Sequence, residues 1–125
     1  MRLYGILPMI SVFLPPQKRL SNQQKPNGDE IGISGITLVE MVYLVEKGRI
    51  PSHEFSLLAR QLADPDSLLR EIPVNLEIAR TLTQINASQI PDMPDRIIAA
   101  TGLNLHVPII SRDAKIQLST IQTIW

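Results

Sequence analysis

The sequence predicts a three-layer α/β domain in which helices cover both faces of a largely parallel sheet. Short apolar segments with strand character alternate along the chain with longer segments of helical periodicity, which is typical of consecutive βαβ units. The chain has 125 residues, of which 44% are hydrophobic and 19% are charged. That size and balance are typical of one globular domain with a substantial core. We therefore expect residues 1–125 to form a single domain.

The first thirty residues differ in composition from the rest. They hold four of the ten prolines, and no Asp or Glu occurs before Asp29. The apolar run Leu3–Leu14 is shorter than the roughly 20 residues that span a bilayer. Only Arg2 supplies charge near it, and no small-residue cleavage site follows, so a buried strand is favoured over a signal peptide. A turn-rich connector should occupy residues 17–28.

A strand and a helix are predicted next. Residues Ile31–Ile36 alternate apolar with small side chains, which indicates a short strand. A helix should start at Thr37 and end near Gly48, a residue suited to the end of a helix. Its apolar residues recur at helical spacing and predict one buried stripe, namely Leu38, Met41, Val42 and Val45.

The remaining segments continue the alternation. Apolar periodicity predicts further helices, and the runs of β-branched residues between them predict strands. The expected helices are His53–Leu69 with a break near residues 64–66, Leu76–Ile85, a helix from Pro94 with Ile97, Ile98, Thr101 and Leu105 buried, and a short helix from Asp113 to Leu118; the expected strands are Glu71–Val74, Val107–Ser111 and Ile121–Trp125, and residues 86–93 form a loop.

Composition excludes several kinds of site. The formal net charge is zero, with 12 basic and 12 acidic residues, so any contact with nucleic acid needs a local basic patch or a metal ion. The chain has no cysteine, which excludes disulfides and thiolate ligands and fits a reducing, cytoplasmic compartment. His53 and His106 lie far apart in the chain, so a histidine-based metal site is not expected.

Three acidic residues lie where a strand or loop leads into a helix: Glu40, Asp95 and Asp113. One interpretation is structural. Thr37 and Glu40 have the spacing of a capping box, Asp92 is placed to cap the helix that carries Asp95, and Asp113 is placed to cap the last helix. The other interpretation is functional, because such turns meet at one edge of a parallel sheet. Clustered carboxylates bind Mg²⁺ or Mn²⁺, and such a site activates water for attack on a phosphodiester. One acid can serve both roles.

The segments that carry these acids resemble a known family. Residues 33–40 (Ile-Ser-Gly-Ile-Thr-Leu-Val-Glu) and 44–50 (Leu-Val-Glu-Lys-Gly-Arg-Ile) resemble the second strand and following helix of VapC-like PIN domains. Residues 94–101 (Pro-Asp-Arg-Ile-Ile-Ala-Ala-Thr) resemble the third acidic motif of that family, and residues 108–113 (Pro-Ile-Ile-Ser-Arg-Asp) resemble the fourth. Residues 120–125 resemble the closing strand.

The resemblance covers residues 31–125 and leaves residues 1–30 as a divergent segment. It implies a PIN-like α/β/α fold and a site in which acids bind Mg²⁺ or Mn²⁺ for endonucleolytic cleavage of RNA. It also implies the role of toxin in a toxin–antitoxin pair, with RNA as substrate, an antitoxin protein as partner, formation of a homodimer, and no membrane association. The residues that match the family's site are Glu40, Asp95 and Asp113 as catalytic metal ligands, Asp92 as an additional ligand, and Ser111 and Arg96 beside them.

The chain departs from the family at its start. VapC-like domains open with a strand that ends in an Asp, whereas residues 1–16 contain no acid, and Asp29 and Glu30 lead into the next strand. Three explanations stay open: a degenerate and inactive copy, a frameshift or wrong start codon, or a site in which the remaining acids hold one metal ion.

Three hypotheses about function follow. The first is a metal-dependent ribonuclease toxin. The second is a catalytically impaired PIN module that binds RNA or an antitoxin without cutting. The third is a plain α/β domain whose acids only cap helices.

Overall fold

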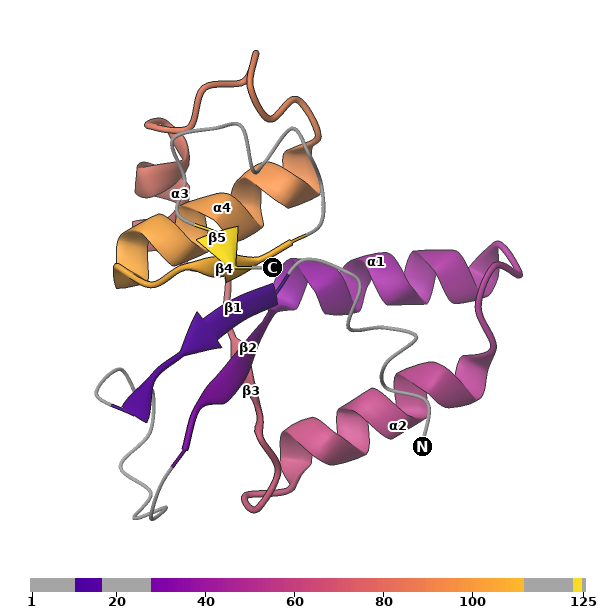
Figure 1. The fold of residues 1–125 in the computed structure, drawn as a ribbon. Coiled ribbons are helices and arrows are strands. Elements are labelled where there is room, and N and C mark those ends of the chain that lie inside the picture. The colour runs from indigo at the N-terminus through magenta and orange to yellow at the C-terminus, as the bar shows by residue number, and fades with distance from the viewer. Residues whose placement is uncertain (1–10, 17–27, 112–122, 125) are drawn as a thin grey trace.

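The computed structural model of the protein describes residues 11–16, 28–111 and 123–124. Strands and helices alternate along much of this part of the chain, as the sequence predicts (Figure 1). The elements are β1 (Ser11–Leu14), β2 (Glu30–Ser34), α1 (Gly35–Glu46), α2 (Ser52–Ala63), β3 (Leu69–Ile72), α3 (Leu76–Leu82), α4 (Met93–Leu105), β4 (Ile109–Ile110) and β5 (Thr123–Ile124).

The five strands form one sheet in the order β3-β2-β1-β4-β5. β2 and β3 pair in parallel, with Ile31 opposite Leu69, and β4 and β5 also pair in parallel. The central strand β1 is antiparallel to both of its neighbours: Val12 lies opposite Gly32 of β2 and opposite Ile109 of β4. Four of the five strands therefore run in one direction, which confirms the largely parallel sheet, and β1 alone runs against them.

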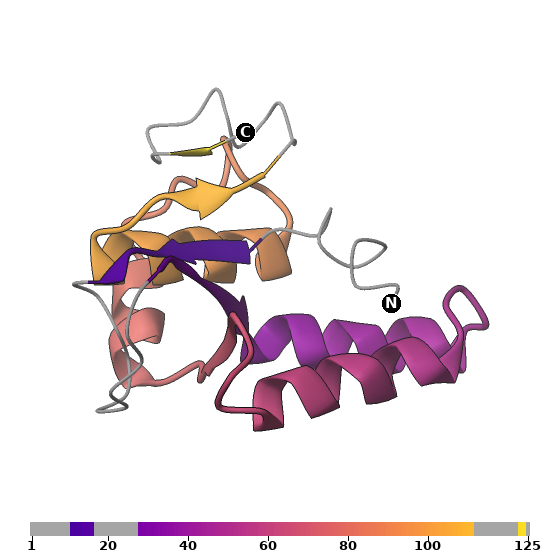
Figure 2. The same ribbon diagram turned by 60° about the horizontal axis from the view of Figure 1, so that its bottom comes forward.

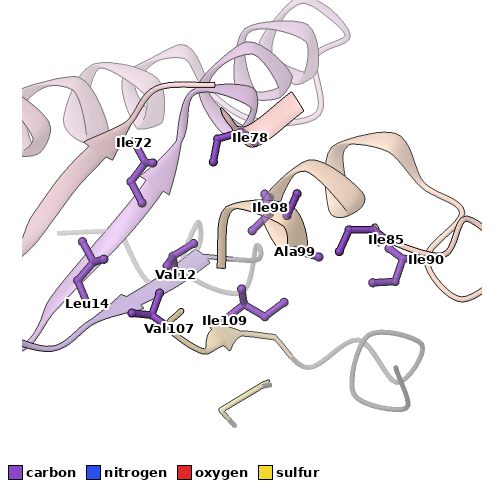
Figure 3. Packing of buried hydrophobic residues seen from close by; sticks show 11 residues of the cluster. Val12, Leu14, Ile72, Ile78, Ile85, Ile90, Ile98, Ala99, Val107 and Ile109 are labelled. Atoms are coloured by element: carbon purple, nitrogen blue, oxygen red, sulfur yellow. The ribbon is translucent and has the colours of Figure 1, made fainter. Parts of the chain in front are cut away.

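Helices pack on both faces of the sheet, which confirms the three-layer architecture. Residues on β1 and β4, together with α3 and α4, form one buried cluster, in which Val12 and Ile109 have no exposed surface (Figure 3). A second cluster joins β2 and β3 to α1 and α2 around Met41 and Leu58. Figure 2 shows the α1–α2 hairpin set apart from α3 and α4. In β3, Leu69 belongs to the second cluster and Ile72 to the first, as expected for side chains three residues apart on a strand.

The apolar run near the N-terminus provides the central strand. Residues 11–14 of Leu3–Leu14 form β1, and three of these four residues are buried. This confirms the predicted buried strand for that part, while residues 3–10 lie outside the described residues. Within the described segments, no helix combines the length and the apolar character that crossing a membrane requires.

Several predicted boundaries are wrong by a few residues, with identifiable causes. The strand predicted at Glu71–Val74 instead occupies Leu69–Ile72 and ends before Pro73, which has no N–H to continue the ladder. α2 ends at Ala63, because the turn at residues 64–66 stops the helix. α3 ends at Leu82, but Ile85 is still buried as predicted. The helix predicted from Asp113 lies outside the described residues, and β5 falls within the predicted closing strand.

Two predictions about α1 are corrected. The helix begins at Gly35 rather than Thr37, because the Ser34 side chain caps it by accepting a hydrogen bond from the Ile36 N–H at 3.2 Å. Thr37 is buried and its Oγ1 makes no hydrogen bond, so the predicted capping box with Glu40 is not formed. Met41 is buried as predicted, whereas Val42 is 42% exposed. The buried stripe of α1 is therefore narrower than the apolar spacing predicted.

Close packing of α4 against β4 predicts a specific sensitivity to volume. A Cβ added at Gly102 would lie 2.6 Å from Ile109 Cγ2 and 3.1 Å from the Val107 carbonyl oxygen. We expect Gly102→Ala to destabilise the protein by about 1–3 kcal/mol, the usual cost of overpacking a core, despite the better helix propensity of alanine. Urea unfolding measures the change. Gly35→Ala is the matched control, because its Cβ would meet only ordinary contacts at 3.8 Å; equal stability of the two variants would contradict the packing described.

Candidate active site

The predicted site lies at the edge of the sheet where the four co-directional strands end. β2 ends at Ser34 and leads directly into α1, and β4 ends at Ile110, which Ser111 follows. Because β1 is reversed, its first residue lies at this same edge: Ser11 is opposite Ile110. The three serines that these strands bring to the edge are all buried, with at most 2% of their surface exposed. The edge therefore carries three buried serine hydroxyl groups in addition to the nearby acids.

Glu40 reaches this region from the second turn of α1. The position of the helix is fixed by the Ser34 cap, which our sequence analysis did not identify although serine before Gly-Ile is a common start signal for a helix. Glu40 is half-buried. The end of β2 therefore sets the position of Glu40 at this edge of the sheet. The functional interpretation predicts such a position.

Asp92 and Asp95 lie at the start of α4. The Asp92 Oδ2 accepts a hydrogen bond from the Asp95 N–H at 3.2 Å, and Pro94 occupies the first turn. This confirms the predicted cap by Asp92 and the position of Asp95 in the first turn, where a negative charge favours the helix dipole. The structural interpretation is thus correct for Asp92.

The charges of Glu40 and Asp92 interact across the two helices, since α1 contacts α4. Partial burial of Glu40 raises the pKa of its carboxyl group, and the negative charge of Asp92 raises that pKa further. The ionised form of Glu40 is disfavoured beside the charge of Asp92, and a cation placed between the two carboxylates would stabilise it. The structure therefore brings together two of the acids that the sequence singled out.

Hard oxygen donors of this kind suit Mg²⁺ or Mn²⁺, but the described residues supply only part of a site. Among residues 11–16, 28–111 and 123–124, no group of three His, Cys, Asp or Glu side chains is arranged to hold a metal ion. Asp113, the fourth predicted ligand, lies outside them. The donor chemistry at Glu40 and Asp92 fits a divalent cation, and the number of donors depends on residues beyond this pair.

The other predicted site residues have distinct environments. Arg96 is half-buried beside Asp95, and its Nε is buried without a hydrogen-bond partner. It forms no ion pair among the described residues. Ser111 is 1% exposed at the end of β4. His53 and His106 are exposed, and His106 ends α4 in the left-handed conformation with φ 57°.

β1 does not end at the site edge. It runs away from that edge and ends at Leu14, opposite Glu30 at the far end of β2, and residues 1–16 contain no acid. Glu30 is itself engaged there, because its Oε2 forms an ion pair with Arg70 at 3.1 Å, with 8% and 12% of the two side chains exposed. Glu30 therefore cannot serve as a ligand at the site edge, as the sequence indicated.

A comparison with protein families decides the relationship. The profile described as PIN domain matches residues 15–119. The chain belongs to the PIN domain family. The match begins at Pro15, immediately after β1, so it includes the segments that carry all the predicted acids but not the reversed strand. Searches of curated proteins and of solved structures found no match.

Membership of the PIN family gives the site a chemical context. PIN domains are a family of nucleases that act on nucleic acids and generally use divalent metal ions. The α/β architecture of this chain and the acids at the carboxyl edge of its sheet agree with that context.

The electrostatics of Glu40 predict the sign of a pH effect. Since its pKa in the folded protein is raised, the native state holds the proton more tightly than the unfolded chain. Stability attributable to this group is full below the ordinary glutamate pKa and declines as the pH rises to the raised value. We expect Glu40→Gln to remove that decline, so that it is more stable than the wild type at neutral pH and unchanged in acid. Thermal unfolding at several pH values measures this.

Glu46→Gln provides the control for that experiment, because Glu46 is exposed on the same helix and its substitution changes the net charge equally. If Glu46→Gln alters the pH dependence as much as Glu40→Gln does, the effect comes from net charge rather than from the environment of Glu40. Asp92→Asn is informative as well: asparagine keeps the cap of α4, and loss of the charge should lower the pKa of Glu40.

Proposed function

We propose that the protein is a metal-dependent endoribonuclease of the PIN type and the toxin of a toxin–antitoxin pair. The observation that carries this proposal is the pairing of Glu40 with Asp92 at the carboxyl edge of the sheet, where partial burial and like charge raise the pKa of Glu40. A structural role for Asp92 alone does not require a second carboxylate facing it. Membership of a nuclease family supports the same conclusion.

The proposed ligands are Glu40, Asp92, Asp95 and Asp113, which would hold Mg²⁺ or Mn²⁺. A bound divalent ion would neutralise these charges and polarise the phosphodiester and the attacking water. Arg96 follows Asp95 in the chain, and its buried Nε has no hydrogen-bond partner among the described residues; it would meet the phosphate that enters the site. Ser111, two residues before Asp113 in the chain, would brace the end of β4. Asp95, Glu40 and Asp113 are the residues we assign to catalysis.

The partners proposed with this function are an RNA substrate, a cognate antitoxin protein and a second copy of the chain, in the cytoplasm. Their support is the resemblance of residues 31–125 to VapC-like domains. These assignments are separate from the chemistry of the site, so failure of one leaves the others to be tested on their own.

A second candidate function is favoured by a specific observation. No acid precedes Asp29, and the described residues contain no group of three ligands for a metal ion. A PIN module with this deficit would bind RNA or an antitoxin without cutting. The two candidates differ in cleavage rather than in binding, so one set of variants distinguishes them.

Metal binding is measured by thermal unfolding of the wild type and of Asp95→Asn with and without millimolar Mn²⁺. A ligand that binds only the folded state raises the free energy of unfolding by about 2.7 kcal/mol at a hundredfold excess over Kd. We expect Mn²⁺ to stabilise the wild type and to have much less effect on Asp95→Asn, because a ligand has been removed. Asp66→Asn, an exposed site in the α2–β3 turn, is the matched control and should respond like the wild type.

Cleavage is measured on the same three proteins with structured RNA and Mg²⁺ or Mn²⁺ at micromolar protein. Activity that EDTA abolishes, that Asp95→Asn lacks and that Asp66→Asn keeps would support the ribonuclease. Absence of cleavage together with retained RNA binding would refute the catalytic claim and select the non-cutting module.

A further inference from the structure

One aromatic side chain of the described residues lies outside the packed core. Tyr43 on α1 is 56% exposed, whereas Phe13 and Phe55 are both at least half-buried, so among the described residues it is the exposed aromatic. Burial of apolar surface stabilises the fold, and an exposed ring contributes little to it. The narrow stripe that α1 buries, around Met41, leaves Tyr43 on the opposite side of the helix.

Tyr43 lies on the same face of α1 as the site. Glu40, Tyr43 and Lys47 are spaced at i, i+3 and i+7, which places them on one side of an α-helix. At about 1.5 Å per residue, the ring is about 4.5 Å along the helix from Glu40 and the lysine about 10 Å. Glu46, the exposed acid next to Lys47, projects from the helix in a direction about 90° around its axis from this side.

A cation is held over this ring. The Lys47 Nζ lies 5.4 Å from the centroid of Tyr43, within the range of a cation–π contact. Arg49 follows in the exposed turn after the helix. The chain has a formal net charge of zero, so its overall charge does not attract a polyanion such as RNA. Binding therefore needs a local contact of the kind that Lys47 provides.

We propose that the face of α1 formed by Glu40, Tyr43 and Lys47, here termed the α1 track, binds single-stranded RNA next to the acidic site. An unpaired base stacks on Tyr43, and Lys47 contacts the adjoining backbone phosphate, so that the strand leads along the helix to Glu40. The inference rests on the proposed function in that it names the form of the substrate and the residues that hold it. The chemistry of recognition is stacking together with one phosphate contact, which tolerates any base.

An RNA strand fits the α1 track better than a protein does. A protein partner would bury Val39 and Val42, which are exposed on the neighbouring side of α1, and would use Tyr43 only for its apolar area. Such a partner would also remove water from the Lys47 ammonium, which is unfavourable unless an opposite charge meets it. An RNA strand uses both groups, since the ring takes a base and the ammonium takes a phosphate.

The test measures binding of a short, unstructured, fluorescently labelled ribo-oligonucleotide by anisotropy. EDTA is present, so that binding is observed without cleavage. We expect Tyr43→Ala and Tyr43→Leu each to raise Kd about five- to 150-fold, the range for loss of one stacked base. Tyr43→Phe keeps the ring and should bind like the wild type. Lys47→Gln should lower the slope of log Kd against log salt by about 0.7, the value for one phosphate contact with a single strand.

Leu103→Ala is the matched control, because Leu103 is an exposed apolar residue on α4 and should leave Kd unchanged. A duplex of the same sequence should bind more weakly than the single strand, since its bases are stacked on one another. The proposal is overturned if the wild type does not bind the oligonucleotide, or if Tyr43→Leu binds as well as the wild type. The second result would assign Tyr43 to an apolar protein contact, which leucine can replace.

The outcome is distinguishable from that of the proposed function. If Tyr43→Leu loses RNA binding in EDTA while the wild type shows no cleavage with Mn²⁺, the α1 track is supported and the nuclease is refuted. If the wild type cleaves RNA and Tyr43→Leu binds and cleaves equally well, the nuclease is supported and the α1 track is refuted.

Discussion

The whole sheet depends on β1, the central strand that runs against both of its neighbours. It joins two parallel pairs, β3-β2 on one side and β4-β5 on the other, and its Val12 and Leu14 are almost completely buried between them. α1 follows β2 and α4 precedes β4, so β1 links the two halves of the sheet that carry Glu40 and Asp92. Its reversed direction places Ser11 at the same edge of the sheet. β1 thus adds a hydroxyl group to this edge and no carboxylate.

Asp92 shows that capping a helix does not exclude an electrostatic effect on a neighbouring acid. Its carboxylate accepts the Asp95 N–H at the start of α4, and its charge also raises the pKa of Glu40 on α1. A residue that only capped the helix would be most stable far from other acids, because like charges in a partly buried region oppose each other. The fold keeps Asp92 beside Glu40 despite this cost. That cost is removed by a cation, which is the physical reason for placing function at this edge.

The sequence predicted most of the architecture because its periodicity reflects burial directly. Ile98 and Thr101 of α4, and Met41 of α1, are buried where the apolar spacing predicted them. Strand direction was beyond such an argument, because Ser11–Leu14 has the same alternation whichever way it runs. The cap of α1 was assigned to Thr37 because its spacing to Glu40 is that of a capping box, whereas in the fold Ser34 accepts the Ile36 N–H and Thr37 lies within the helix. Tyr43 was not singled out, although it lies off the stripe of Leu38, Met41 and Val45, a signal already present in the sequence.

Binding and cutting draw on different parts of the same helix, and this separates their dependence on the missing acid. Hydrolysis needs enough carboxylates around one cation, so it weakens steeply when β1 contributes none. Stacking on Tyr43 and the phosphate contact of Lys47 need only the exposed face of α1, whose position is fixed by the Ser34 cap and the packing of Met41. Neither depends on the direction of β1. Under the two proposals, RNA binding is therefore the more robust property, because binding along α1 would persist in a chain whose hydrolytic capacity is reduced.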